Sequence, residues 1–138
     1  MSVFKLDKRL AKDTVKVCEL NLCYVGLIKD SRYPWLVLVP QLEGIIEVSD
    51  LDDGAQGLMW REVNKCSLAL QKIFPGYKIN LAALGNVVSQ LHIHLVVRHD
   101  EDAAWPGPVW GMGKAEPYDI AVLETRLENL RRHLGEEV

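Results

Sequence analysis

The chain has 138 residues, of which 49% are hydrophobic and 25% charged, with a formal net charge of -3 at pH 7. This length suits one compact domain, residues 1–138, and the composition excludes a disordered chain. Acidic residues outnumber Lys and Arg, so we expect no nucleic-acid binding and no attachment to a membrane surface. No stretch approaches the roughly 18 apolar residues of a membrane helix, and we expect a cytoplasmic protein.

The first half of the chain predicts a helix, two strands and a second helix. Apolar residues recur at helical spacing over residues 6–20, which indicates an amphipathic helix. Residues 22–28 and 35–39 are rich in branched and aromatic side chains and flank the turn-like KDSRYP, so they predict an antiparallel pair. One helical stripe then extends over residues 51–73, with Ser49 placed as the N-cap.

The second half predicts two more strands and a last helix. Residues 77–84 and 90–97 are joined by GNVVS, a length typical of a hairpin. A long loop rich in Pro, Gly and Trp follows, and its length indicates a cover over a site. Apolar residues on one side of 120–134 predict the last helix. The order α-β-β-α-β-β-α indicates an α+β fold, an antiparallel sheet packed with helices.

The three cysteines are odd in number and form no CxxC pair. A disulfide framework or a cysteine zinc site is therefore not expected. Their aliphatic surroundings predict buried thiols in a reducing compartment. The residues are Cys18, Cys23 and Cys66.

The stretch QLHIHLVVR, residues 90–98, carries the chemistry. Side chains alternate across a strand, so the aliphatic residues face the core while Gln90, His92 and His94 stand in a row on the other face. A hairpin that turns about residue 87 would place Ala82 opposite His92 and Asn80 opposite His94.

A neutral imidazole offers a lone pair that can attack phosphorus, and the phosphoramidate that forms is labile. A donor must neutralise the charge that grows on the phosphoryl oxygens, and His94, Gln90, Asn80 and the backbone amides of residues 85–89 are candidates. Two other interpretations stay open. The histidines are ordinary half-buried strand residues, or they bind a metal, which usually needs three or four ligands.

QLHIHLVV resembles the motif of the histidine-triad (HIT) superfamily, His-φ-His-φ-His-φ-φ with φ apolar, and Gln90 replaces the first histidine. PWLVLVP, the long helix and YKINLAAL precede the motif in the family's order, so the resemblance covers nearly the whole chain. AWPGPVWG is similar to a tail of some bacterial relatives. The resemblance implies a HIT-like fold, commonly a homodimer, and a nucleotidyl hydrolase or transferase that forms a covalent nucleotidyl-histidine without an obligatory metal or other cofactor.

The resemblance also implies roles for single residues. His92 takes the place of the nucleophile, and His94 that of a donor to the phosphate. Gln90 can orient a phosphate or a water but cannot act as a general acid. Further candidates for binding the phosphate or the nucleotide are Asn80, Gly85, Asn86, Ser89, Asp30, Arg98 and Trp105.

Some of these candidates have specific expected contacts. Asp30 would contact the ribose, and Arg98 would reach only a distal charge. Trp105 and Trp110 would stack on a base, or pack in a dimer or over the core. The prediction is a hydrolase that acts at the α-phosphate of a dinucleoside polyphosphate or nucleoside phosphoramidate. The alternatives are a nucleotide-binding module without turnover and a small metalloprotein that uses His92 and His94.

Overall fold

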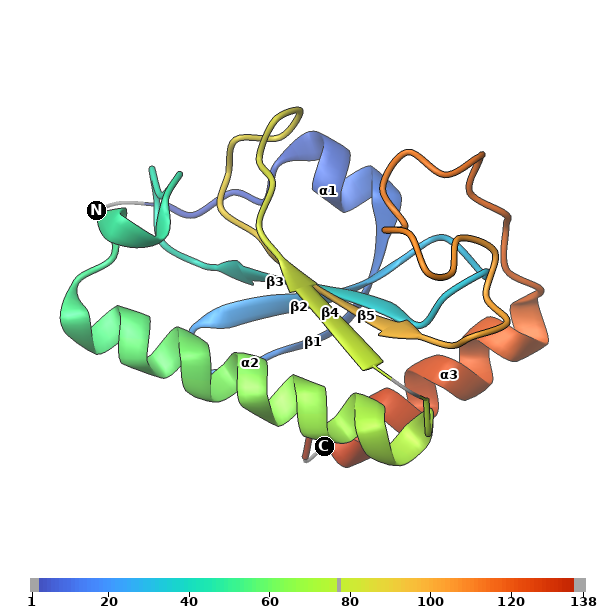
Figure 1. The fold of residues 1–138 in the computed structure, drawn as a ribbon. Coiled ribbons are helices and arrows are strands. Elements are labelled where there is room, and N and C mark those ends of the chain that lie inside the picture. The colour runs from blue at the N-terminus through green and yellow to red at the C-terminus, as the bar shows by residue number, and fades with distance from the viewer. Residues whose placement is uncertain (1–2, 77, 136–138) are drawn as a thin grey trace.

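The computed structural model describes residues 3–76 and 78–135, and these residues form an α+β fold (Figure 1). Five strands form one antiparallel sheet in the order β1-β2-β3-β5-β4. The predicted fold class is confirmed. The strands are β1 (Thr14–Glu19), β2 (Cys23–Ile28), β3 (Trp35–Pro40), β4 (Lys78–Ala82) and β5 (Ile93–Arg98). The helices are α1 (Lys8–Asp13), the 3-10 helix η1 (Val48–Asp50), α2 (Asp53–Ile73) and α3 (Ile120–His133).

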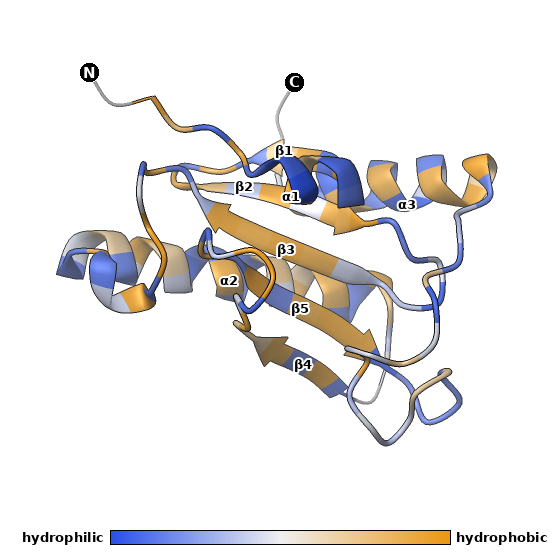
Figure 2. Cartoon of the chain, turned by 90° about the horizontal axis from the view of Figure 1, so that it is seen from above, coloured by the Kyte–Doolittle hydropathy of each residue, from blue (hydrophilic) through white to orange (hydrophobic). Residues whose placement is uncertain are grey.

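The two faces of the sheet are covered differently. Helices α2 and α3 lie against one face, whereas α1, the loop of residues 83–92 and the loop of residues 99–119 lie on the other (Figure 1). The main core lies under α2 and α3, where Leu36 and Leu95 of the central strands belong to one buried cluster with Met59 and Leu130 of the helices. Strands β3 and β5 are hydrophobic over most of their length, as expected for strands buried on both faces (Figure 2).

The helix predicted over residues 6–20 is wrong beyond Asp13. Asp7 caps a short α1 by accepting from the backbone N–H of Arg9 at 2.8 Å, and the chain then continues as β1. Residues 14–19, TVKVCE, contain β-branched side chains that suit a strand, and pairing with β2 decides in its favour.

The other predicted elements are confirmed, with a change at the start of α2. Asp52 is its N-cap and accepts from the Ala55 N–H at 2.8 Å, while Ser49 lies in η1. Tyr77, the first residue of the predicted strand 77–84, lies outside the described residues. The three cysteines are buried thiols, and burial raises the pKa of Cys66 to about 12.

The register predicted for the second hairpin is wrong by two residues. Ala82 lies opposite His94, and Asn80 lies opposite Val96. The reason is that the loop is longer than predicted. The Leu91 N–H donates to the Ile45 carbonyl at 3.0 Å, so the chain before Ile93 is drawn away from β4. The side chains keep their predicted faces, because a shift by two preserves the alternation.

The structure gives no candidate for a membrane span. None of the helices within residues 3–76 and 78–135 combines the length and the apolar character that crossing a bilayer requires.

Candidate active site

A cavity of about 800 Å³ opens on the sheet face that α1 and the two loops surround. Trp35, His92 and His94 contribute to its wall from the sheet side. The loop of residues 99–119 covers another side, as its length predicted, and contributes Val109, Trp110, Gly111, Met112, Gly113 and Ala115. Charged side chains line the wall as well, namely Lys12, Asp13, Lys29, Asp30 and Arg32. We call this space the histidine cavity.

His92 is held by a backbone oxygen. Its Nδ1 lies 2.8 Å from the carbonyl oxygen of Gln90. A carbonyl oxygen only accepts hydrogen bonds, so Nδ1 carries the proton and donates it. In the neutral ring Nε2 then has an unshared electron pair, and it has no hydrogen-bond partner within residues 3–76 and 78–135. His92 therefore offers a nucleophilic nitrogen to a ligand.

His94 is held in the opposite tautomer. The indole N–H of Trp35 donates to Nδ1 of His94 at 3.0 Å. An indole N–H only donates, so Nδ1 of His94 is the acceptor and its Nε2 carries the proton. Burial, and to a lesser extent the charge of His92, lower the pKa of His94 to about 3. At neutral pH His94 is therefore an uncharged donor.

The two rings lie next to each other in the histidine cavity. Their centroids are 4.8 Å apart, and the planes are inclined by 67°. Trp110 packs edge-on against His94, with 5.3 Å between the ring centroids. The pair thus combines a nitrogen lone pair with an adjacent N–H donor. This combination suits attack on a phosphorus atom while the negative charge on its oxygens is stabilised.

Gln90 does not line the histidine cavity, although sequence reasoning placed it at the phosphate. Its Oε1 accepts from the Asp7 N–H at 2.8 Å, and its Nε2 donates to the Lys5 carbonyl at 2.9 Å. Both ends of the amide are therefore occupied by the segment that precedes α1. That helix contributes Leu10 and Lys12 to the cavity wall, so Gln90 supports the wall from behind.

Two other predicted contacts do line the cavity, Asp30 and Asn86. Asp30 is 2% exposed and forms a salt bridge with Arg32, Nη2 to Oδ2, at 2.9 Å. Burial alone would raise the pKa of Asp30, but hydrogen bonds from Arg32 and from the Glu116 N–H outweigh burial and lower it. Asp30 is therefore ionised and held in place at the edge of the cavity.

Three further predicted residues form a separate cluster around the buried Arg98. Arg98 is 2% exposed, donates to Asp102 at 2.8 Å and to Oδ1 of Asn80 at 2.8 Å, and its guanidinium lies 5.7 Å from the centre of the Trp105 ring. Hydrogen bonds from Arg98 outweigh burial and hold the pKa of Asp102 at about 2. Asn80 and Trp105 thus both contact Arg98, and none of the three residues lines the histidine cavity. Gly85, with φ of 74°, shapes the 83–92 loop, and neither it nor Ser89 belongs to the wall as far as the structure describes it.

Sequence reasoning missed Trp35 as a partner of His94. The pairing of β3 with β5 places Val37 opposite His94 and Trp35 opposite Val96, so the indole reaches the imidazole diagonally. No local pattern reports this contact, because the two strands are joined only by tertiary structure. Sequence reasoning also missed Leu10 and Lys12 of α1 as wall residues, because it extended this helix to residue 20 and did not place it beside the site.

The HIT domain family matches residues 9–101. A solved histidine triad protein from Bradyrhizobium japonicum is 41% identical, covers 96% of this chain and 99% of its own, and superposes with a TM-score of 0.95. One from Marinobacter aquaeolei is 40% identical, with coverages of 99% and 100% and a TM-score of 0.94. A third, from Sinorhizobium meliloti, is 42% identical, with 94% and 96% covered and a TM-score of 0.92. No curated protein matches the chain.

Proposed function

The chain belongs to the HIT domain family, and we propose that it is a nucleotide hydrolase that acts at an α-phosphate through a covalent nucleotidyl-histidine. One observation carries this proposal. His92 and His94 are adjacent in one cavity and are held in opposite tautomers, so that one Nε2 can attack while the other donates. The substrates are dinucleoside polyphosphates or nucleoside phosphoramidates.

In the first step, Nε2 of His92 forms a bond to the α-phosphorus, and the bond from phosphorus to the leaving group breaks with its electron pair. The proton on Nδ1 of His92 remains hydrogen-bonded to the Gln90 carbonyl oxygen, and this hydrogen bond stabilises the positive charge that the ring gains. The Nε2–H group of His94 donates a hydrogen bond to a phosphoryl oxygen and keeps its proton. Water then attacks phosphorus, the bond to Nε2 breaks, and a nucleoside monophosphate and a proton are released.

The charges around the cavity support an anionic ligand. The chain as a whole carries a formal charge of -3, yet the cavity wall has three cations, Lys12, Lys29 and Arg32, against the two carboxylates of Asp13 and Asp30. Cations concentrated in a cleft attract phosphates even when the net charge is negative. Asp30 and Asn86 are the remaining polar candidates for contacts to the nucleotide.

The two alternatives predict different behaviour. A nucleotide-binding module would bind the same ligands without turnover. A metal site at His92 and His94 would need further ligands. Among the described residues, the cluster that brings three potential ligand atoms within 4.8 Å of one another consists of His99, Asp100 and Glu101, all exposed, and it includes neither histidine of the cavity.

We also infer that the chain forms a homodimer and acts in the cytoplasm. Strand β4 is at the edge of the sheet, and Leu81 on it is 49% exposed, as is Val87 in the next loop at 75%. An edge strand with apolar side chains suits pairing with a second copy. The buried thiols suit a reducing compartment.

The test compares the wild type with His92→Ala on diadenosine polyphosphate and on adenosine 5′-phosphoramidate, with and without EDTA. His133→Ala is the matched control, because His133 is exposed and bonds the Asn129 carbonyl of its own helix. We expect EDTA to leave turnover unchanged. Turnover should be lost in His92→Ala but not in His133→Ala, and the intact mass of the wild-type protein should show an added nucleotidyl group. Turnover that survives His92→Ala overturns the proposal, and binding without turnover identifies the nucleotide-binding module.

A further inference from the structure

We propose that Trp35 is a positioning residue that fixes His94 as an uncharged donor, and that it thereby restricts the site to substrates whose leaving group departs as an anion. The substrate class is then the phosphoanhydride, as in a dinucleoside polyphosphate, rather than the phosphoramidate. This inference rests on the proposed function and narrows it.

The hydrogen bond between Trp35 and His94 is built into the sheet. Trp35 is 9% exposed on central strand β3 and packs with Tyr33, Val96 and Val109. Protonation of Nδ1 on His94 would point two N–H groups at each other, 3.0 Å apart. The contact with Trp35 therefore opposes the cationic form of His94, in the same direction as the burial that lowers its pKa.

The described neighbours of His94 include no carboxylate that would stabilise a positive charge on its ring. Along its own strand it faces His92, and on the neighbouring strands it lies opposite Val37 and Ala82, which are apolar. The loop of residues 99–119 presents Trp110 to it.

The charged groups of the cavity wall come from α1 and from the turn between β2 and β3. Asp30 bonds Arg32 and holds no proton at neutral pH, because its pKa is lowered. Asp13 lies 3.7 Å from the guanidinium of Arg9, oxygen to nitrogen. Lys12 and Lys29 also line the wall and are suited to stabilising a negative oxygen, whereas Arg32 is bonded to Asp30 and to the Met112 carbonyl. The wall is thus suited to binding an anionic leaving group rather than to protonating a basic one.

The two candidate substrates differ in what leaves. Cleavage of a phosphoanhydride by Nε2 of His92 breaks a P–O bond, and the electron pair stays on a phosphate oxygen that is stable as an anion. Cleavage of a phosphoramidate breaks a P–N bond, and the nitrogen must gain a proton because an amide anion is far too basic. Gln90 cannot supply a proton, since a carboxamide does not titrate, and its amide is bonded to Asp7 and Lys5.

The first experiment reads the tautomer and the charge of His94 by nitrogen NMR between pH 5 and pH 8. In the wild type we expect a neutral ring with the proton on Nε2 throughout. Trp35→Phe leaves His94 buried but removes the N–H that faces its Nδ1, so we expect the pKa of His94 to rise above its wild-type value and the proton to distribute over both ring nitrogens. Trp110→Phe is the matched control, because Trp110 also packs its ring on His94 but donates no hydrogen bond to it among the described residues, and it should leave the tautomer unchanged.

The second experiment compares kcat/KM for diadenosine polyphosphate and adenosine 5′-phosphoramidate at pH 7. We expect the wild type to favour the anhydride by at least about 100-fold, and Trp35→Phe to reduce this ratio by at least about tenfold, because a larger fraction of His94 carries a second proton when the opposing N–H is gone. The kcat of the variant should also gain a dependence on pH below 7.

Should Trp35→Phe fold poorly, the wild type alone decides, through a series of aryl esters of adenosine monophosphate. Without a general acid, kcat/KM falls steeply as the pKa of the departing phenol rises. A flat series, a ratio near one, or a His94 that titrates in the wild type near its ordinary pKa overturns the inference. If the wild type cleaves neither substrate, the proposed function fails together with the leaving-group preference, while the NMR result still decides the role of Trp35.

Discussion

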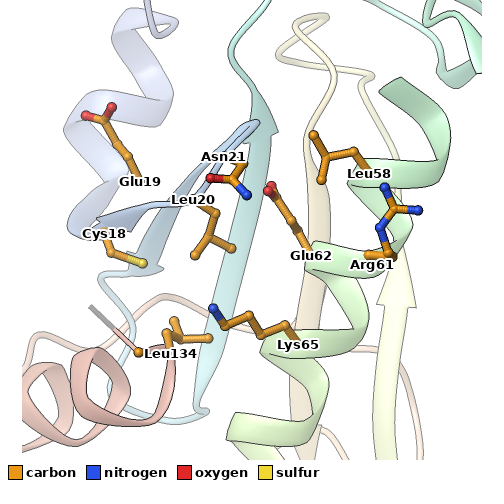
Figure 3. Close-up of a pocket in the computed structure, with 10 residues that line it drawn as sticks. Cys18, Glu19, Leu20, Asn21, Leu58, Arg61, Glu62, Lys65 and Leu134 are labelled. Carbon is orange, nitrogen blue, oxygen red and sulfur yellow. The ribbon is translucent and has the colours of Figure 1, made fainter. Parts of the chain in front are cut away.

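Two cavities on opposite faces of the sheet are each lined by buried polar side chains. These side chains differ in whether their polar atoms are already hydrogen-bonded. The second cavity, of about 390 Å³, lies between the turn of β1 and β2, α2 and the end of α3 (Figure 3). Glu62 points from α2 toward this turn and is 5% exposed. Its carboxylate accepts from the Leu22 N–H at 3.0 Å and from the Cys23 N–H at 2.9 Å.

The difference lies in which atoms are already bonded. Both oxygens of Glu62 accept from backbone N–H groups, so the carboxylate fastens a turn to a helix. His92 and His94 use only Nδ1 for internal hydrogen bonds, and within the described residues each Nε2 has no partner. Burial of a polar group is therefore no sign of function by itself in this protein, since Tyr33 Oη and Trp110 Nε1 are also buried without a partner among the described residues. The two histidines differ from Glu62 because each lines a large cavity and keeps one ring nitrogen unbonded within the described part of the chain.

The largest effect should follow from removing the unsatisfied nitrogen. In His92→Gly we expect kcat to fall by at least about 10³-fold, because the covalent route is lost. Added imidazole should restore part of the activity, since the space of the missing ring can hold a free one. Turnover assays with and without imidazole measure both effects. A variant that keeps wild-type kcat would mean that His92 resembles Glu62 in being structural.

The converse change tests Glu62. In Glu62→Gln an amide NH₂ or a neutral oxygen replaces a charged acceptor of two backbone N–H groups, and we expect the free energy of unfolding to drop by about 3 kcal/mol. Urea denaturation measures it, and kcat of the folded protein should be unchanged. Glu19→Gln is the control, because Glu19 lines the same cavity but its side chain is 49% exposed, and it should change stability by less than about 1 kcal/mol. Equal losses for both variants would contradict the structural role.

Acid should destabilise the fold through His94. Its pKa is about 3 in the folded protein and 6.5 as the ordinary value, so the unfolded chain binds a proton first as the pH falls. The stabilisation is complete above pH 6.5 and is lost as the pH falls toward 3, by about 2 kcal/mol between pH 7 and pH 5. Urea denaturation at both pH values measures it. The pKa of Asp102 is lowered from its ordinary 3.8 to about 2, so its stabilising contribution is present above pH 3.8, is lost only as the pH falls below that value, and does not affect the comparison of pH 7 with pH 5.

The control for this pH effect is His94→Asn, which lacks the titrating ring. The loss of stability between pH 7 and pH 5 should be smaller in this variant by the same amount. An identical loss in both proteins would show that His94 does not carry the effect.

The sequence predicts which residues of the motif strand face the core and which face the cavity. It does not predict the contacts between segments that are far apart in the chain. The alternation in QLHIHLVV correctly placed Leu91 and Ile93 in the core and both histidines on the opposite face. The motif identified the family. The tautomers were not predictable, because one depends on a carbonyl in the chain itself and the other on Trp35, which lies 59 positions away.

The errors have the same origin. TVKVCE has too few residues for its own pattern to separate a strand from the end of a helix, and only the pairing with β2 decides. The register of β4 and β5 depends on a hydrogen bond from Leu91 to Ile45, two segments that sequence reasoning had no cause to join. Asn80 was therefore placed beside His94, whereas it bonds Arg98.

Gln90 provides the smallest and most discriminating test. Its amide holds the segment before α1, so Gln90→Ala should loosen the wall that Leu10 and Lys12 form and raise KM by up to about tenfold, as expected for two lost hydrogen bonds. We expect kcat to stay within about twofold, because no contact to the reacting atoms is removed. Gln56→Ala is the control, since its amide also bonds a backbone oxygen, that of Leu51, away from the cavity. If kcat fell and KM stayed constant, Gln90 would act on the phosphate in the transition state. A side chain whose amide is already hydrogen-bonded would then be catalytic, and hydrogen-bond satisfaction would not separate structural from functional residues at the first position of the motif.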